Sequence, residues 1–239
     1  MGAREADQPK SGSDHSRGRV YSSHRFCDFS GYFTVVLGMK QYKEEVRRHY
    51  DLLIDEGNDP VHDSEELRRY MDGWDGQIFM EELNPNSNAD ILEIGVGSGR
   101  LAVRVAQQCR AFTGIDLSPK TIVRARENLK NFSNVTLICA DFLEYAFIEK
   151  FDLVYSSLTF FHIYEKEKAV RKIAAILKDK GRLVLSLDKG RKEILDFGSR
   201  CLRVYPDSPA EIGEYAAKAG LELLKQVETG RAYIVSFKK

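Results

Sequence analysis

Three glycines at alternate positions follow an acidic residue before the middle of the chain. They are Gly95, Gly97 and Gly99, and Glu93 stands two residues before the first of them. Glycine lets a backbone turn tightly and approach a ligand closely, and the start of a following helix attracts negative charge. Apolar residues precede this run and a helical repeat follows it, so the segment predicts a strand, a tight turn and a helix. Such a turn is typical of sites for cofactors that carry a nucleoside.

The glycine spacing distinguishes between kinds of nucleotide site. In a dinucleotide-binding turn the third glycine comes three residues after the second, and here that position is Arg100. A P-loop needs a Gly-Lys-Ser/Thr sequence, which does not follow these glycines. The turn therefore fits neither pattern.

Two further acidic residues stand where predicted strands end. Asp116 closes the second expected strand, and Asp141 follows the third. Because open α/β sheets bind ligands at the carboxyl ends of their strands, we expect both carboxylates beside the glycine turn. The alternative is that each only caps the helix after it, although Ser118 is a competent cap for the helix after Asp116.

Short apolar segments alternate with helical ones from residue 89 onward. Strands are expected near residues 90–95, 111–115, 134–139, 151–157 and 181–187. Helices are expected near residues 99–109, 119–130, 142–147 and 164–177. This alternation predicts an α/β fold, with a parallel sheet covered on both faces. After a helix from Pro209 to about Ala219, two strands joined by Thr229-Gly230 predict an antiparallel hairpin over 221–237.

The part of the chain before residue 89 has a different character. Residues 1 to about 20 are polar, with almost no large apolar side chains, and are expected to be disordered. Phe26 to Leu37 is aromatic and β-branched, and either pairs as a strand or packs on a surface. Helical repeats begin near Met39, so three parts are expected: a disordered or loosely attached segment (1–38), a helical part (39–88) and the core (89–239).

Three helices are expected in residues 39–88. The first has an apolar stripe at helical spacing, made of Tyr42, Val46, Tyr50 and Leu53. This spacing favours burial of the two tyrosines in the core over a place in a ligand site. A capping box opens the second helix, with Asp63 as N-cap and Glu66 reaching back, and the helix runs to about Trp74. The third spans roughly residues 77–83.

Taken in order, these motifs resemble those of the class I S-adenosylmethionine-dependent methyltransferases over about residues 40–239. The first motif of that family is Glu/Asp-x-Gly-x-Gly-x-Gly, which the segment from Glu93 to Gly99 matches. Asp116 and Asp141 match its acids after strands two and three, and 151–156 and 177–183 match its later segments. The resemblance implies a Rossmann-like, doubly wound sheet of seven strands, mostly parallel, with a C-terminal antiparallel hairpin and residues 39–88 as a helical lid.

The resemblance also implies the cofactor and the residues that hold it. S-adenosylmethionine would lie with its methionine part beside Gly95 and Gly97, and Asp116 would accept both ribose hydroxyls. Asp141 would accept from the adenine amino group while Phe142 packs on the ring. The other residues expected at the cofactor are Glu93, Val96, Gly99, Leu117, Ser156 and Trp74. An aromatic face such as that of Trp74 can favour a sulfonium, although packing between the lid and the core is the alternative role.

His162 is the candidate catalytic base. It comes just after the fourth expected strand, and histidine titrates near neutrality. Methyl transfer is a direct displacement in which alignment supplies much of the rate, so a base is needed only for a protonated acceptor. The alternative is a structural histidine that closes the strand and bonds a backbone group, and the sequence leaves both open.

Charge and composition bear on the acceptor. The 36 basic and 36 acidic residues give a net charge of zero, which argues against a strong grip on nucleic acid. We therefore predict a small-molecule acceptor, with an RNA or protein methyltransferase or a non-catalytic S-adenosylmethionine-binding protein as alternatives. Residues 188–207 are basic and either contact an anionic acceptor or form a solvated loop.

Cysteine usage and hydropathy bear on metal binding and location. The four cysteines form no Cys-x-x-Cys pair, so no metal site is predicted, and free thiols in a reducing cytoplasm are expected for Cys27, Cys109, Cys139 and Cys201. No apolar run reaches the roughly 18 residues that a membrane span needs, so no membrane association is predicted. The oligomeric state is left open.

Overall fold

The structure is a computed structural model that describes residues 35–239. The predictions for the polar tail and for most of the segment from Phe26 to Leu37 lie outside these residues. The last three residues of that segment begin the first helix, α1 (Val35–Asp55). Helical structure therefore starts before Met39, the predicted beginning of the helical part.

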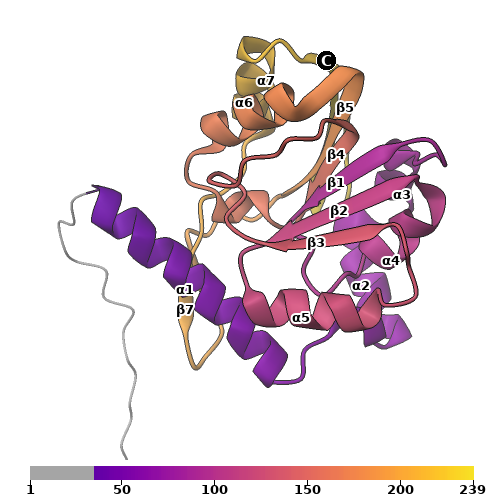
Figure 1. Ribbon diagram of the computed structural model, residues 1–239. Helices are drawn as coiled ribbons and strands as arrows, with labels where there is room; N and C mark the ends of the chain where they lie inside the picture. Colours follow the sequence, from indigo (N-terminus) through magenta and orange to yellow (C-terminus); the bar gives the residue numbers. More distant parts are fainter. Residues whose placement is uncertain (1–34) are drawn as a thin grey trace, which may run out of the picture. The chain divides into compact units, whose positions relative to one another are not determined.

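A single seven-stranded sheet forms the centre of the fold, in the order β3-β2-β1-β4-β5-β9-β8 (Figure 1). Its strands are β1 (Asp90–Ile94), β2 (Ala111–Asp116), β3 (Val135–Cys139), β4 (Phe151–Ser157), β5 (Leu177–Asp188), β8 (Glu222–Glu228) and β9 (Ala232–Lys238). Strands β1 to β5 pair in parallel, and β9 runs antiparallel to both β5 and β8. The predicted doubly wound sheet and its terminal hairpin are confirmed.

Helices cover both faces of this sheet. On one face lie α3 (Gln77–Leu83), α4 (Ala102–Val105) with the 3-10 turn η2 (Ala106–Gln108), and α5 (Pro119–Asn128). On the other face lie α6 (Lys166–Ile176) and α7 (Pro209–Lys218) (Figure 1). Because side chains alternate along a strand, Ile91 packs into the first layer and its neighbour Leu92 into the second. Strands β1 to β5 and β9 thus contribute to two cores, whereas β8 at the edge of the sheet is largely exposed.

The sheet has a switch point between β1 and β4. Successive strands from β1 proceed to one side through β2 and β3, and then the chain crosses back to β4 on the other side of β1. Helices leave these neighbouring strands in opposite directions, which opens a crevice at the carboxyl ends of the strands. The glycine turn follows β1 and His162 follows β4, so both stand at this crevice.

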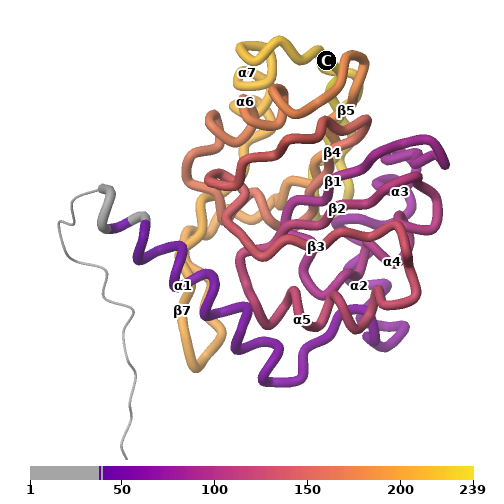
Figure 2. The backbone as a smooth tube through the Cα atoms, in the orientation of Figure 1, coloured from indigo at the N-terminus to yellow at the C-terminus, as the bar shows by residue number. Residues whose placement is uncertain are grey.

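Helix α1 and a small hairpin stand beside the crevice. Helix α1 lies along α5 (Figure 1), and Lys120 Nζ forms an ion pair with Asp55 at 2.5 Å. Strands β6 (Ile194–Asp196) and β7 (Cys201–Arg203) form a two-stranded sheet inside the predicted basic segment 188–207. Helix α1 passes beside β7 (Figure 2), and Tyr42 packs on Leu202.

Two local predictions are wrong. Residues 142–147 form a turn and not a helix. The Asp141 carboxylate accepts the Leu143 N–H at 2.8 Å, which closes a single turn. The rings of Tyr145 and Phe147 then pack edge to face at 4.8 Å, so aromatic packing and not helical hydrogen bonding directs this segment. The cap of α2 (Glu65–Asp75) is Ser64 and not Asp63, because Ser64 Oγ accepts the Leu67 N–H.

The cysteines and the helices complete the description. Cys109 and Cys139 are free thiols as predicted, whereas Cys201 is disulfide-bonded, so the expectation of a free thiol is wrong there. Within residues 35–239, no helix has both the length and the apolar character that crossing a membrane requires. The same residues contain no group of three or more histidine, cysteine or acidic side chains placed to hold a metal ion.

Candidate functional site

A cavity of about 480 Å³ lies at the carboxyl ends of β1 to β4, with α1 and the β6–β7 hairpin on its other side. This volume is within the range of about 300–1,000 Å³ that is usual for small-molecule sites. Most of the predicted site residues line it, namely Glu93, Gly95, Val96, Gly97, Asp116, Leu117, Asp141, Phe142 and His162. Residues from three strand ends and one 3-10 turn are thus brought to one place.

The glycine turn forms the floor of the cavity. Gly95 and Gly97 have φ angles of +77° and +57°, in the left-handed region that favours glycine. A Cβ on Gly95 would stand 2.1 Å from Oγ1 of Thr159, whereas a Cβ on Gly97 would meet no atom within 4 Å. Because Gly95 has no side chain, the chain that follows β4 can pack against it. The absence of a side chain at Gly97 leaves the floor of the cavity open.

Asp116 is held by the backbone of the same turn. Its Oδ2 accepts the Gly97 N–H at 3.0 Å and its Oδ1 accepts the Ser118 N–H at 2.9 Å. Burial raises the pKa of Asp116, and these backbone donors oppose that shift. A carboxylate has about four acceptor positions, so two remain for a ligand. Ser118 and not Asp116 caps α5, since Ser118 Oγ accepts the Thr121 N–H.

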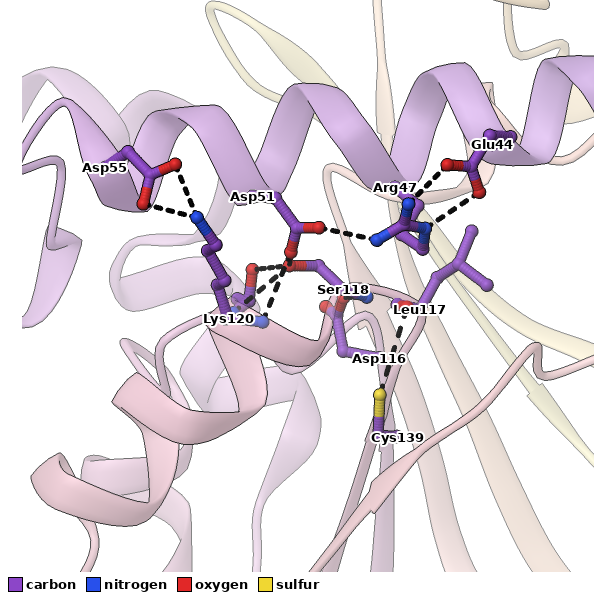
Figure 3. A network of polar contacts seen from close by, with 10 residues as sticks. Glu44, Arg47, Asp51, Asp55, Asp116, Leu117, Ser118, Lys120 and Cys139 are labelled. Carbon is purple, nitrogen blue, oxygen red and sulfur yellow. Dashed lines mark hydrogen bonds and ion pairs between the residues drawn. The ribbon is translucent and has the colours of Figure 1, made fainter.

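Helix α1 is tied to this loop by a network of polar contacts (Figure 3). Asp51 Oδ1 accepts from Ser118 Oγ at 2.7 Å, and Asp51 Oδ2 accepts from Arg47 at 2.7 Å. Arg47 also binds Glu44 on the same helix. The carboxylate of Asp51 thus joins α1 directly to the residues that follow Asp116.

Asp141 makes a second link to α1. Its Oδ2 lies 2.5 Å from Lys43 Nζ, and its Oδ1 accepts the Leu143 N–H. The neighbouring Phe142 is buried, with 7% of its surface exposed, and its ring contributes to the cavity wall. The third strand end therefore offers a carboxylate and an aromatic face side by side.

Glu93 is a buried carboxylate beneath the turn. It accepts from the Tyr155 hydroxyl at 2.8 Å. Burial raises the pKa of Glu93 to about 8, while the Tyr155 hydrogen bond and the Arg100 charge lower it by less. Arg100 itself forms a two-armed ion pair with the fully buried Asp75 of α2. The arginine that replaces the dinucleotide glycine thus fastens α2 to the glycine turn.

His162 lies in the 3-10 turn η3 (Phe160–His162), after a left-handed residue, Leu158, with φ +53°. Its Nε2 is 2.7 Å from the hydroxyl of Tyr50 on α1. Burial lowers the pKa of His162 to about 3, and the charges of His49 and Lys166 act in the same direction. Its Nδ1 is buried and has no hydrogen-bond partner among the described residues. The imidazole is therefore neutral near pH 7 and is paired with a side chain of α1 rather than with a backbone group.

Residues 92–185, which include the floor and η3, match the sequence model of the methyltransferase domain family. The chain contains a class I, S-adenosylmethionine-dependent methyltransferase domain. This family was predicted from the motifs, and the match confirms it.

Curated relatives of this methyltransferase domain are similar over part of their length. A malonyl-[acyl-carrier protein] O-methyltransferase of Acetivibrio thermocellus is 35% identical over 111 residues, which are 46% of this chain and 39% of that protein. Nodulation protein S of Sinorhizobium fredii is 28% identical over 111 residues, 45% of this chain and 51% of that protein. The chain thus spans about half, or less, of the length of these relatives.

Solved structures share the fold of the methyltransferase domain. Magnesium protoporphyrin IX methyltransferase of Synechocystis, solved with S-adenosylhomocysteine, has a TM-score of 0.62 at 18% identity, over 82% of this chain and 99% of that chain. The [4+2]-cyclase SpnF has a TM-score of 0.63 at 18% identity, over 82% of this chain and 96% of that chain. These likenesses show the fold, which serves more than one kind of reaction.

Three residues predicted at the cofactor do not line the cavity of the methyltransferase domain. Trp74 Nε1 donates to Asp188 at 2.6 Å, and the Arg231 guanidinium lies 4.8 Å from the centre of its ring. Ser156 Oγ donates to the carbonyl of Ile94 at 2.8 Å. A Cβ on Gly99 would stand 3.2 Å from the side chain of Leu129, inside the core. The cation–π contact expected of Trp74 is made with an arginine of the protein itself.

Sequence reasoning missed several residues that α1 contributes to the site. Tyr42 and Tyr50 line the cavity, although their spacing favoured the core, and Tyr42 also packs there against Leu202. The residues Lys43, Arg47 and Asp51 follow one another at four-residue spacing on one face of α1. This polar stripe beside an apolar stripe was the signal that a second surface faces α1.

Proposed function

We propose that the protein transfers a methyl group from S-adenosylmethionine to a small-molecule acceptor. The observation that carries the proposal is the convergence of the glycine turn, Asp116 and Asp141 on one cavity at the strand ends of a methyltransferase domain. Relatives named as methyltransferases and neighbours solved with S-adenosylhomocysteine support the choice of cofactor.

The chemistry of the cavity fits this cofactor. S-adenosylmethionine carries a sulfonium, an ammonium and a carboxylate, so its net charge is positive, and when bound it supplies an electrophilic methyl group. Within residues 35–239 the cavity is lined by the carboxylic side chains of Asp63, Asp116, Asp141 and Glu165, and by Glu93, which its raised pKa of about 8 leaves largely protonated near pH 7. In the described part of the chain, three cationic side chains line it, those of Lys43, Arg47 and Arg100. An excess of acids around a partly buried space favours a positively charged ligand.

Each part of the cofactor has residues that suit it. Asp116 has two free acceptor positions for a pair of ribose hydroxyls. The open floor at Gly97 leaves room for the methionine part beside the backbone. Asp141 and Phe142 offer an acceptor and an aromatic face for the adenine. Asp51 and Lys43 hold α1 next to two of these positions, so we propose that residues 39–88 act as the lid.

His162 is the proposed base, and the hydroxyl of Tyr50 contacts its Nε2 atom. We propose that the acceptor gives its proton to Tyr50 Oη while Tyr50 passes its own proton to His162 Nε2, across the 2.7 Å contact. Tyr50 stays neutral in this exchange, which agrees with the raised pKa that burial gives it. A group with a pKa of about 3 is a weak proton acceptor, so alignment of the acceptor supplies most of the rate.

Titration calorimetry with S-adenosylhomocysteine tests the proposal. The wild-type chain should bind, and Asp116→Ala should weaken binding by about tenfold or more, because a charged hydrogen-bond partner is worth about 1.5–3 kcal/mol. Asp179→Ala is the matched control, since Asp179 is an exposed carboxylate on β5 away from the cavity. Absence of binding by the wild-type chain at millimolar ligand would contradict the proposal.

A further inference from the structure

The cavity has a second wall, opposite the glycine turn, that carries apolar side chains. Helix α1, the residues around η3 and the β6–β7 hairpin supply it. We call it the acceptor wall, and define it by Tyr42, Val46, Phe161, Leu195, Phe197 and Leu202. None of these residues belongs to the motifs that the cofactor explains, so this wall is left for another ligand.

No cationic side chain at the cavity is free to hold an anion. Lys43 Nζ lies 2.5 Å from Asp141, and Arg47 lies 2.7 Å from Asp51. Arg100 makes both arms of its ion pair with Asp75. All three lining cations therefore already have a carboxylate partner.

The two histidines at the cavity add no positive charge. Burial lowers the pKa of His49 to about 4, and the charge of Arg200 lowers it further. Arg200 Nε donates a hydrogen bond to His49 Nδ1 at 3.0 Å. His162 is paired with Tyr50, as described above. A carboxylate or phosphate at the acceptor wall would be desolvated without a charged partner, which is strongly unfavourable.

One polar group on the acceptor wall is left without a partner. The hydroxyl of Tyr42 is buried and makes no hydrogen bond within the described part of the chain. Buried hydroxyls normally have a partner, so this one is a candidate contact for a polar substituent on a bound molecule. Burial raises the pKa of Tyr42 well above its ordinary range, which keeps the hydroxyl neutral.

We infer that the acceptor is an uncharged small molecule with an apolar, preferably aromatic, ring that packs on the acceptor wall, because none of the six residues of that wall is acidic or basic and an ion of either sign would be desolvated there. It carries a single hydroxyl or comparable polar group. This inference rests on the proposed function. Rings pack favourably on aromatic side chains, and Phe161 and Phe197 supply such faces from two different elements.

The test uses three probes that share one ring system and differ in charge: 2-naphthol, 2-naphthoate and (2-naphthyl)methylammonium. The full chain is first saturated with S-adenosylhomocysteine, and each probe is titrated by calorimetry. We expect 2-naphthol to bind at least about tenfold more tightly than 2-naphthoate, because the anion finds no free cation. Equal or tighter binding of 2-naphthoate or of the ammonium would overturn the inference.

The first titration separates two kinds of failure. If S-adenosylhomocysteine binds and 2-naphthol does not bind at millimolar concentration, the acceptor class is wrong and the proposed function stands. If S-adenosylhomocysteine itself does not bind, the proposed function fails and the acceptor class fails with it.

Two variants locate the probe on the acceptor wall. Phe197→Ala should weaken the binding of 2-naphthol by about two- to tenfold, which is the range of an aromatic contact. The affinity for S-adenosylhomocysteine should be unchanged. Phe197 is 43% exposed at the hairpin, so its loss should not unfold the chain. Tyr42→Phe should remove the preference for 2-naphthol over naphthalene.

Leu224→Ala is the control for these variants, because Leu224 is an exposed side chain on β8 that does not line the cavity. It should bind both ligands as the wild-type chain does. Unchanged 2-naphthol binding in both Phe197→Ala and Tyr42→Phe would show that the probe is not on the acceptor wall, and would overturn the assignment.

Discussion

The floor of the cavity and α1, which belongs to the proposed lid, are held in place by different kinds of interaction. On the floor, backbone groups dominate: Gly97 N–H binds Asp116, and β1 pairs with β2 in parallel register. The lid is held by side chains, through Asp51 to Ser118, Lys43 to Asp141 and Tyr50 to His162. The floor is therefore set by local conformation and strand pairing, whereas the lid depends on pairs of residues far apart in the sequence.

This difference suggests a division of roles. Backbone contacts tolerate little change, and they surround the part of the cavity that suits a constant cofactor. Side-chain contacts can be exchanged one pair at a time, and they surround the acceptor wall. Changes in the floor should therefore affect folding and cofactor binding together, whereas changes in the lid should affect binding with a small loss of stability.

The largest effect is expected at the floor, from Gly95→Ala. A methyl group there overlaps Thr159 and demands a left-handed backbone, which together cost about 2–4 kcal/mol of unfolding free energy. For a chain of this size, each kcal/mol lowers the melting temperature by about 2–4 °C. Thermal and urea unfolding measure the loss.

Gly97→Ala is the matched control for that change. Its φ of +57° makes alanine unfavourable, but the new Cβ meets nothing within 4 Å. It should cost only about 1–2 kcal/mol of unfolding free energy. It should also weaken the binding of S-adenosylhomocysteine, because the new methyl group stands in the cavity. Equal destabilisation by the two variants would contradict the distinction between them.

A smaller effect is expected where the lid meets the floor, from Asp51→Ala. The change removes the acceptor for Ser118 Oγ and for Arg47, and should cost about 1–2 kcal/mol. Affinity for S-adenosylhomocysteine should fall severalfold, because α1 is less firmly held over Asp116. Calorimetry and urea unfolding on the same samples measure both quantities.

Asp55→Ala, one turn further along α1, controls for loss of an acidic residue. Its ion pair with Lys120 is about half exposed and should contribute only about 0–1 kcal/mol. If Asp55→Ala and Asp51→Ala lower the affinity for S-adenosylhomocysteine equally, the contact between Asp51 and Ser118 has no special role in binding.

The pH dependence of stability probes the contact between Tyr50 and His162. The pKa of His162 falls from 6.5 to about 3 on folding, so between these values the unfolded chain binds a proton that the folded chain does not. The contribution of His162 is therefore fully present above pH 6.5 and is lost progressively as the pH falls toward 3. Urea unfolding of His162→Gln should show a shallower loss of stability on acidification than the wild-type chain.

His62→Gln is the control, since His62 is an exposed residue on the 3-10 turn η1 (Pro60–His62) and does not line the cavity. Its acid profile should follow the wild type, including the part due to His49, whose pKa is about 4. Identical slopes for His162→Gln and wild type would mean that His162 titrates normally in the folded protein.

The smallest effect is expected from Trp74→Phe. Trp74 bonds Asp188 and stacks with Arg231 outside the cavity, so S-adenosylhomocysteine affinity should stay within about twofold of wild type. A tenfold loss by calorimetry would place Trp74 at the cofactor after all.

The same comparison explains what could be predicted from the sequence. The glycine turn and Asp116 follow from residue type and strand alternation, and the structure brings them together as expected. The turn at 142–147 could not be predicted, because the packing of Tyr145 against Phe147 decides it and not helical propensity. Trp74 was misplaced because its partners, Asp188 and Arg231, are more than a hundred residues away in sequence.

The lid residues follow the same logic. Nothing in the order of residues joins Tyr50 to His162 or Asp51 to Ser118, since parallel strands place distant segments side by side. The hairpin of β6 and β7 was expected as a loop because its strands have only three residues each. Short strands carry too little pattern to be recognised by alternation.

Hydrogen–deuterium exchange with and without S-adenosylhomocysteine tests most directly whether the cofactor lies between floor and lid. We predict slower exchange in residues 93–99 and 116–120 and along α1 when the ligand is bound, with no change in β8, which lies at the far edge of the sheet. Binding without protection of either the glycine turn or α1, or protection centred elsewhere, would contradict the account.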